Sequence, residues 1–419
     1  MSLDVIPPLI DQHARDAAFY WRQIDVSRFS PIVTQQKLKH FHRQLDAHLD
    51  GLCVAGESGW KAAYKNLTRW KTQGEAFVCM WLALGLQNEA HFDALRRIIS
   101  EHPDTTVRGV IGAMARLPYA QAEPLLNLWL NSSNELLLEI ALRAFGAQRK
   151  APGKDLSELF VHTNPRIRAA CCQLTGKLRL QAHQSNIHQA LVDIEAQVRE
   201  QAALANFWLS PKASITDELY ELLTRNLQNT PKRGLASVIA KRRMELLARM
   251  LGHTTSRGSE RLPQLLSTLP ERLRILMLAH HGDPAQLPYL LHALENETTA
   301  RLAFWAIGLI TGIDTTAPEL CAPAPEPKEG ANTLSTATDD ADVGLEWPNV
   351  PIVVAACQPF SLKTGPLLMG QTPTIKHCLN VMATAPQAAR FAASWHWARL
   401  DAKAPQVDTR YMEIPALCV

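Results

Sequence analysis

The sequence has no uninterrupted apolar run that approaches the roughly 18 residues needed by a membrane-spanning helix. Its first residues, MSLDVIPPLIDQHARD, carry no basic segment ahead of an apolar core. We therefore expect neither a membrane span nor a secretory signal, and we predict a cytoplasmic protein.

An excess of charge of one sign is also missing, because 43 Lys and Arg face 40 Asp and Glu, for a net charge of +3. A balance this close argues against a polyanion held by bulk charge alone. The eight cysteines form no CxxC pair, and Cys171 and Cys172 lie on or beside an apolar stripe. The sequence therefore predicts buried, reduced thiols rather than disulfides or metal ligands.

Motifs that carry known chemistry are absent from the sequence. The chain has no P-loop, GxGxxG or GxSxG motif. Its 15 histidines include no His-Glu dipeptide, the pair that a di-iron centre built on helical repeats would need. The sequence thus predicts no catalytic, cofactor-binding or metal-ligating residue, and we expect a protein that is not an enzyme.

What the sequence does contain is one helical pattern that recurs about every thirty residues between Phe77 and Ala205. Apolar residues fall at i, i+3, i+4 and i+7, which places them on one face of an α-helix. A second apolar segment precedes each later stripe, and short polar turns separate the two. We predict an all-α fold, an α-solenoid of helical hairpins in which Gly85 and Gly146 end two of the helices. The complete stripes are Phe77, Met80, Trp81 and Leu84; Val107, Val110, Ile111 and Met114; Leu138, Ala141, Leu142 and Phe145; and Ile167, Ala170, Cys171 and Leu174.

The register skips after Val198, and clean stripes resume at Met244, Leu273 and Leu302. The extra residues predict an insertion within about 209–243, and insertions in repeat arrays often emerge on the binding face.

The predicted organisation has four parts. Between the first two helices and the array lies the glycine-containing stretch His48–Trp60, which predicts either a capping turn or a binding loop. The parts are an N-terminal helical cap at 1–60, the solenoid at 61–313, an acidic Pro-rich linker at 314–346 that we expect to be flexible, and a C-terminal helical hairpin segment at 347–419.

Ten basic residues are candidates for contacting a partner. One group recurs with the repeat and would line one edge of the array as a basic ridge, while the other lies in the predicted insertion. The repeating arginines have a second interpretation, a ladder in which each pairs with a carboxylate or carbonyl of the adjacent unit. We favour the ladder because the net charge is small. The candidates are Arg166, Arg168, Lys177, Arg179 and Arg199 in the repeats, and Lys232, Arg233, Lys241, Arg242 and Arg243 in the insertion.

Several segments resemble known helical-repeat proteins. A repeat of this length with Val-Arg or Ile-Arg opening the second helix, as at Val107-Arg108 and Ile167-Arg168, resembles the short HEAT-like repeats of the phycobilin-lyase type. Four flanking segments, HLDGL with Gly59-Trp60, HGDPAQLPYLLHAL with LITGID, the acidic stretch ending in EWP, and GPLLMGQTP, resemble one bacterial HEAT-like repeat family. Genes of that family are often found beside type VI secretion components. The resemblance implies a cytoplasmic scaffold that binds a protein partner, such as an adaptor or chaperone for a secreted effector, and it supplies no catalytic residue or cofactor.

Two functional hypotheses follow. The first is a protein-binding scaffold that grips its partner on the repeat surface. The second is a nucleic-acid binder, or a HEAT-like DNA glycosylase, that uses the basic ridge and some of the ten tryptophans. A further hypothesis is that the acidic segment 314–346 folds back over the basic ridge as a pseudo-ligand. The sequence predicts no partner identity and no oligomeric state.

Overall fold

The structure is a computed structural model that describes residues 6–210, 215–231, 233–326, 340–404 and 406–410. It confirms the predicted all-α helical-repeat fold, and regular strand in the described residues is limited to one short pairing. The described chain forms two compact units. Residues 6–28, 35–210 and Arg410 belong to the first, and residues 29–34 and 215–409 belong to the second.

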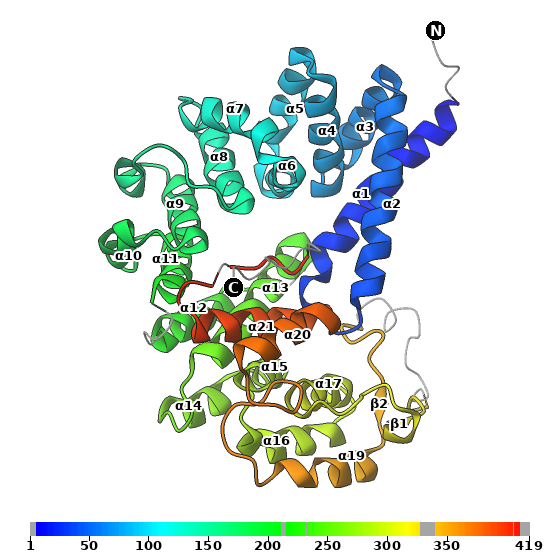
Figure 1. Ribbon diagram of the computed structural model, residues 1–419, viewed down its shortest axis with the longest axis vertical. Coiled ribbons are helices and arrows are strands. Elements are labelled where there is room, and N and C mark those ends of the chain that lie inside the picture. The colour runs from blue at the N-terminus through cyan, green and yellow to red at the C-terminus, as the bar shows by residue number, and fades with distance from the viewer. Residues whose placement is uncertain (1–5, 211–214, 232, 327–339, 405, 411–419) are drawn as a thin grey trace. The chain divides into compact units, whose positions relative to one another are not determined.

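The first unit is built on five inner helices that stack in a row and span 14 residues each. Most residues of the predicted apolar stripes are buried, and Phe77, Val110 and Ile167 are each 0% exposed. Trp81, Leu84 and Ile111 are half-buried. Figure 1 shows the outer helices along one side of this row. The inner helices are α4 (Gln73–Leu86), α6 (Pro103–Arg116), α8 (Glu135–Gln148), α9 (Pro165–Leu178) and α11 (Ala196–Leu209), and the outer ones are α5 (Glu89–Glu101), α7 (Tyr119–Leu130) and α10 (Gln184–Ala190).

Local sequence explains where these helices begin and end. The side chain of Asn134 accepts bonds from two backbone N–H groups of the first turn of α8, and Asn164 caps α9 ahead of Pro165. The prediction that Gly85 and Gly146 end helices is wrong, because both lie inside α4 and α8. The chain instead leaves these helices at Gln87 and Arg149, which adopt φ values of 50° and 56°.

Two pairs of inner helices approach each other at a glycine. A Cβ on Gly109 of α6 would lie 1.9 Å from the carbonyl oxygen of Gln73 at the start of α4. A Cβ on Gly176 of α9 would lie 2.7 Å from the Cα of Ala205 in α11. The backbones can therefore pack this closely only because these two positions carry no side chain.

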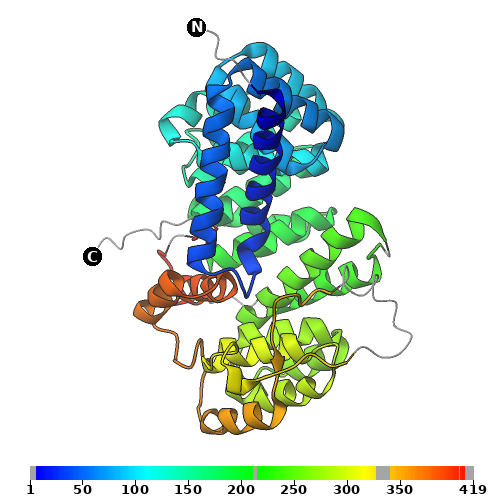
Figure 2. The same cartoon turned by 90° about the vertical axis from the view of Figure 1, so that its right-hand side faces the viewer.

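The N-terminal helices of the predicted cap at 1–60 pack on the first repeat and share the core of the first unit. Helices α1 (Pro7–Val26) and α2 (Gln35–Val54) lie side by side, as Figure 2 shows. The ring of Trp21 stacks on Phe77 of α4 at a centroid distance of 5.1 Å. The glycine-containing stretch is a tight turn at Gly56, with φ 54°, that leads into α3 (Glu57–Trp70). The expected cap therefore packs on the first repeat as part of the array.

The second unit continues with helices and one small sheet. The predicted insertion holds a complete helix and the first half of another, so it is folded rather than an extended loop. Two helices of the second unit also approach closely at a glycine. A Cβ added to Gly252 would lie 2.2 Å from the carbonyl oxygen of Met277. The elements are α12 (Thr216–Gln228), α13 (Gly234–Thr254), α14 (Arg261–Thr268), α15 (Glu271–His281), α16 (Leu287–His292), α17 (Ala300–Thr311), β1 (Cys321–Ala322), β2 (Trp347–Pro348), α19 (Val350–Cys357), α20 (Ile375–Thr384) and α21 (Gln387–Leu400).

The C-terminal segment is bound to the same chain's repeats. The backbone N–H of Leu367 donates to the carbonyl of Gly282 at 2.8 Å, next to the end of α15. The N–H of Met369 donates to Leu309 of α17 at 2.7 Å, and that of Gly370 donates to Ile310 at 2.9 Å. These bonds satisfy carbonyls that helix ends leave open, so the stretch before α20 fastens α15 and α17 together.

The acidic segment expected to be a flexible linker is ordered at both of its described ends. Strand β1 pairs antiparallel with β2, placing Cys321 opposite Pro348. Asp340 accepts from Arg301 at 2.5 Å, and Asp342 is held by Arg272 at 2.8 Å. Most of the middle, residues 327–339, lies outside the described residues. The described carboxylates 340 and 342 thus neutralise arginines of α15 and α17 rather than the ridge at 166–199.

Candidate functional site: an apolar groove in the first unit

Arg168 is held in contacts between neighbouring repeats. Its Nε and Nη2 donate to the two carboxylate oxygens of Asp193, both at 2.8 Å, and both side chains are 13% exposed. Its Nη1 also donates to the carbonyls of His162 and Thr163, at 2.8 and 3.1 Å. The bonds from Arg168 lower the pKa of Asp193, so this carboxylate stays ionised and paired.

Arg166 and Arg199 are engaged in the same way. The Nε of Arg166 donates to the buried carboxylate of Glu139 at 2.8 Å, and its Nη1 donates to Asp104 at 3.0 Å. The Nη1 of Arg199 donates to the carbonyls of Asp193 and Ile194 at 2.5 and 2.7 Å. Arg166 and Arg168 therefore contact carboxylates of neighbouring units, as the ladder predicts, whereas Arg199 binds carbonyls of the turn that precedes its own helix.

The remaining basic candidates of the repeats are partly buried. Arg179 occupies the left-handed position that ends α9, and its guanidinium lies 5.8 Å from the ring centroid of Trp208. The aliphatic stem of Lys177 packs beside Gly146. Both side chains are therefore packed against neighbouring helices of the array.

The basic residues of the insertion are more accessible. Arg233, Lys241 and Arg242 are exposed, and Arg243 is half-buried. Lys232 lies outside the described residues. The structure thus divides the nine described candidates into a mostly engaged group in the first unit and a largely exposed group in and just before the first half of α13.

A shallow apolar groove lies between the outer helices α5 and α7 of the first unit. Its walls come from α5, from Trp129 of α7 and from the start of α8, and inner helices contribute the floor through Met80, Val110 and Ile140. Each of these outer helices packs on inner helices rather than closely against the other. The gap between them leaves Phe92, Leu136 and Leu137 half-buried at the rim, while the floor residues are buried.

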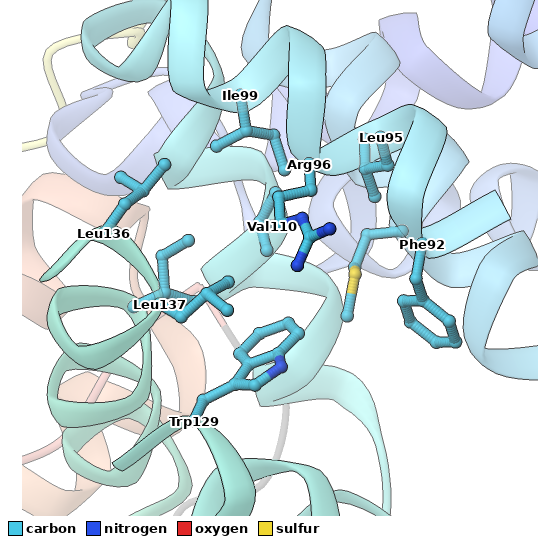
Figure 3. Close-up of a pocket in the computed structure, with 10 residues that line it drawn as sticks. Phe92, Leu95, Arg96, Ile99, Val110, Trp129, Leu136 and Leu137 are labelled. Carbon is cyan, nitrogen blue, oxygen red and sulfur yellow. The ribbon is translucent and has the colours of Figure 1, made fainter. Parts of the chain in front are cut away.

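The groove combines aromatic, aliphatic and cationic groups. Figure 3 shows Leu136 and Leu137 toward one end and Phe92 toward the other, with Trp129 along one side and Arg96 between them. Arg96 is exposed and also pairs with Asp93 of its own helix at 2.8 Å. Two aromatic rings, three leucines and one exposed guanidinium suit an apolar side chain with a neighbouring carboxylate.

The chain matches no protein-family model, no curated protein sequence and no solved structure.

The thiols of the described residues do not resemble reactive cysteines. Burial raises the pKa of Cys172 to about 12 and that of Cys378 to about 12, so neither thiol ionises near neutral pH. Cys53 is exposed, and burial of part of its side chain raises its pKa as well. Within the described ranges, no group of three or more His, Cys, Asp or Glu residues could hold a metal ion. None of the helices described is long and apolar enough to cross a membrane.

The sequence pattern did not reveal the groove. Leu136 and Leu137 precede the stripe that starts at Leu138, and Phe92 precedes the apolar positions Leu95 and Ile99. Apolar residues just outside a helical stripe were the available signal. Their meaning depended on the spacing of α5 and α7, which periodicity does not encode.

Proposed function

We propose that this chain is a non-enzymatic scaffold that binds a protein partner through the apolar groove between α5 and α7. The observation that carries the proposal is the groove itself, at whose rim the half-buried apolar side chains of Phe92, Leu136 and Leu137 come from successive repeats. Repeat arrays use such surfaces because each unit adds a few contacts to an extended partner.

The state of the arginine ladder supports a protein partner over a nucleic acid. Phosphate binding needs guanidinium donors that are free to leave their present acceptors. Arg166, Arg168 and Arg199 donate to carboxylates or carbonyls of the array, so binding phosphate would require these internal contacts to break.

The groove also indicates the kind of segment that would bind. Its floor and walls favour large apolar side chains, and Arg96 favours a carboxylate beside them. An amphipathic helix or an extended peptide with one acidic residue next to its apolar anchors has this chemistry. On the resemblance to the family encoded beside type VI secretion components, we propose a cytoplasmic adaptor role, with a secreted effector or a secretion component as the partner.

A substitution inside the groove tests this proposal. Changing Leu137 to Asp places a charge in the apolar wall, and recovery of a partner by the tagged protein should fall about tenfold or more, as for a central interface residue. The matched control is Leu128→Asp, because Leu128 is 66% exposed on α7 and does not line the groove. Partners are captured from the native cytoplasm at low and moderate salt and identified by mass spectrometry, with circular dichroism confirming that both variants are folded.

The outcomes separate the two functional classes. Loss of a salt-resistant protein partner in Leu137→Asp but not in Leu128→Asp supports the scaffold. Equal recovery by both variants argues against the groove as the binding site. Recovery of nucleic acid that is washed off at moderate salt would favour the alternative function, nucleic-acid binding. The exposed side chains of Arg233, Lys241 and Arg242 are the observation that supports this alternative.

A further inference from the structure

Four histidines gather inside the second unit from three helices that are distant in sequence. His253 lies near the end of α13, His280 and His281 close α15, and His396 lies in α21. His253 and His280 are each 1% exposed, and His281 is 6% exposed. Histidine is seldom buried in groups, because each protonated ring would need a compensating partner.

The ring of His253 is the centre of the cluster. Its Nε2 lies 3.1 Å from Nδ1 of His280, and its ring stacks on Trp395 with centroids 5.2 Å apart. The ring of His396 contacts it nearly edge-on at 5.0 Å. Arg399 of α21 donates to the backbone carbonyl of His253. Residues of α21 therefore close over α13 and α15 at this point.

The shared hydrogen bond requires at least one neutral ring. If His253 and His280 both carried a second proton, two N–H groups would face each other across 3.1 Å. The outer nitrogens, Nδ1 of His253 and Nε2 of His280, have no hydrogen-bond partner within the described part of the chain. In the neutral pair one ring donates across this contact and the other carries its proton on its outer nitrogen, so a further proton on the donating ring would add another buried N–H without an acceptor.

The charged groups around the cluster also disfavour added protons. On the α13 side are Arg249 and Arg257, the latter bound at 3.0 Å to Asp283, the carboxylate that faces His281. Burial lowers the pKa of His253 and His280 well below the ordinary value, and burial with Arg399 lowers that of His396 to about 3. The titratable and charged groups that face the cluster are Arg249 and His253 of α13, Arg257 after it, His280 and His281 of α15, Asp283 beyond its end, His377 of α20, and His396 and Arg399 of α21.

We propose that this histidine cluster is an acid-sensitive lock that holds the α20–α21 hairpin on α13 and α15 and releases it when the histidines take up protons. The inference goes beyond the proposed scaffold role, because it concerns the second unit and stands without the groove. Release would uncover the apolar side chains that now pack around His253, including Phe391 and Trp395.

The sign of the pH dependence follows from the closed state binding fewer protons than the open state. Docking is at full strength above the ordinary histidine value of 6.5 and weakens as the pH falls below it. Consider a histidine that stays neutral in the docked state and has its ordinary pKa in the released state. As the pH falls from about 7.5 to about 5.5, each such histidine raises the equilibrium constant for release of the hairpin about tenfold. Two such residues raise it about a hundredfold.

Hydrogen exchange of the full chain, read by mass spectrometry and normalised for the intrinsic pH effect, tests this lock. Amides of α21 should exchange at least about a hundredfold faster at about pH 5.5 than at about pH 7.5, while those of α17 should change far less. The double variant His253→Phe/His280→Phe keeps aromatic rings at both positions and removes the two buried titrating groups. The acid-induced increase in exchange of its α21 amides should be about a hundredfold smaller than in the wild type. His292→Phe is the control, because His292 is 81% exposed in α16 and should keep the full response.

Two results would overturn the lock. The first is an equal acid response in α21 and α17, which would mean that the whole unit loosens. The second is a double variant that keeps the wild-type response. If the double variant does not fold, His396→Phe replaces it, and this single change should remove about tenfold of the acid response, whereas an unchanged response again contradicts the proposal.

Discussion

Replacing Gly109 with alanine should lower the free energy of unfolding by about 3 kcal/mol, the upper end of the usual range for overpacking. The new Cβ would lie 1.9 Å from the carbonyl oxygen of Gln73 and 2.8 Å from the backbone nitrogen of Phe77. Both obstacles are backbone atoms of α4, so no side-chain rotation can relieve the clash. Helix α6 would have to move away from α4, and the buried contacts of both helices would weaken.

The matched control is Gly85→Ala in α4 of the same unit. Nothing lies within 4 Å of a Cβ added there, and the position is helical. Alanine should therefore raise the stability by about 0.5–1 kcal/mol, because it restricts the unfolded chain and favours the helix. Urea unfolding followed by circular dichroism measures both changes. Equal midpoints for Gly109→Ala and the wild type would show that the close approach of α4 and α6 contributes nothing to stability.

The repeat could be predicted because helix geometry relates sequence spacing directly to a buried face. Residues at i, i+3, i+4 and i+7 share one side of a helix, and Val110 and Ile167 are buried as this requires. The exact helix ends were less accessible to prediction. Gln87 and Arg149 adopt the left-handed conformation, although glycine is the residue that usually marks it.

Several glycines mark places where helices pack closely rather than places where helices end. Gly109, Gly176 and Gly252 sit where one inner helix meets the next, whereas Gly85 has open space around it. All lie within helical segments, so the sequence alone does not tell a packing glycine from an incidental one. The distinction depends on how closely the next helix approaches, which is a tertiary property.

The histidine cluster and the acidic segment also depend on contacts between distant parts of the sequence, which local patterns do not predict. His253 and His280 lie 27 residues apart in sequence, close to the repeat length, and this spacing was the available clue to their contact. Nothing local linked either residue to His396 in α21. Similarly, composition predicted flexibility for 314–346, while the pairing of Asp340 and Asp342 depends on arginines supplied by α15 and α17.

Reversing the charge of Arg168 should also have a large effect on stability. Arg168→Glu removes two bonds of 2.8 Å to Asp193 and two bonds to backbone carbonyls, and it places a second carboxylate beside Asp193. Because both partners of the native pair are only 13% exposed, the loss should be about 3–5 kcal/mol, as for other buried pairs with one partner removed. Arg168→Lys should lose less, since it keeps the charge but not the bidentate geometry.

The control for charge reversal is Arg97→Glu, at an exposed position of α5, which should change the stability by less than about 0.5 kcal/mol. Urea midpoints measured side by side decide between the ladder and the basic ridge. If Arg168→Glu unfolds at the same urea concentration as Arg97→Glu, the guanidinium of Arg168 adds little to the array and is available to a phosphate. If it unfolds much earlier, loss of nucleic-acid binding in this variant would not identify a phosphate contact, because the binding surface itself would be damaged. Tests of the nucleic-acid alternative would then move to Lys241 and Arg242, whose exposed side chains can be reversed with less effect on the fold.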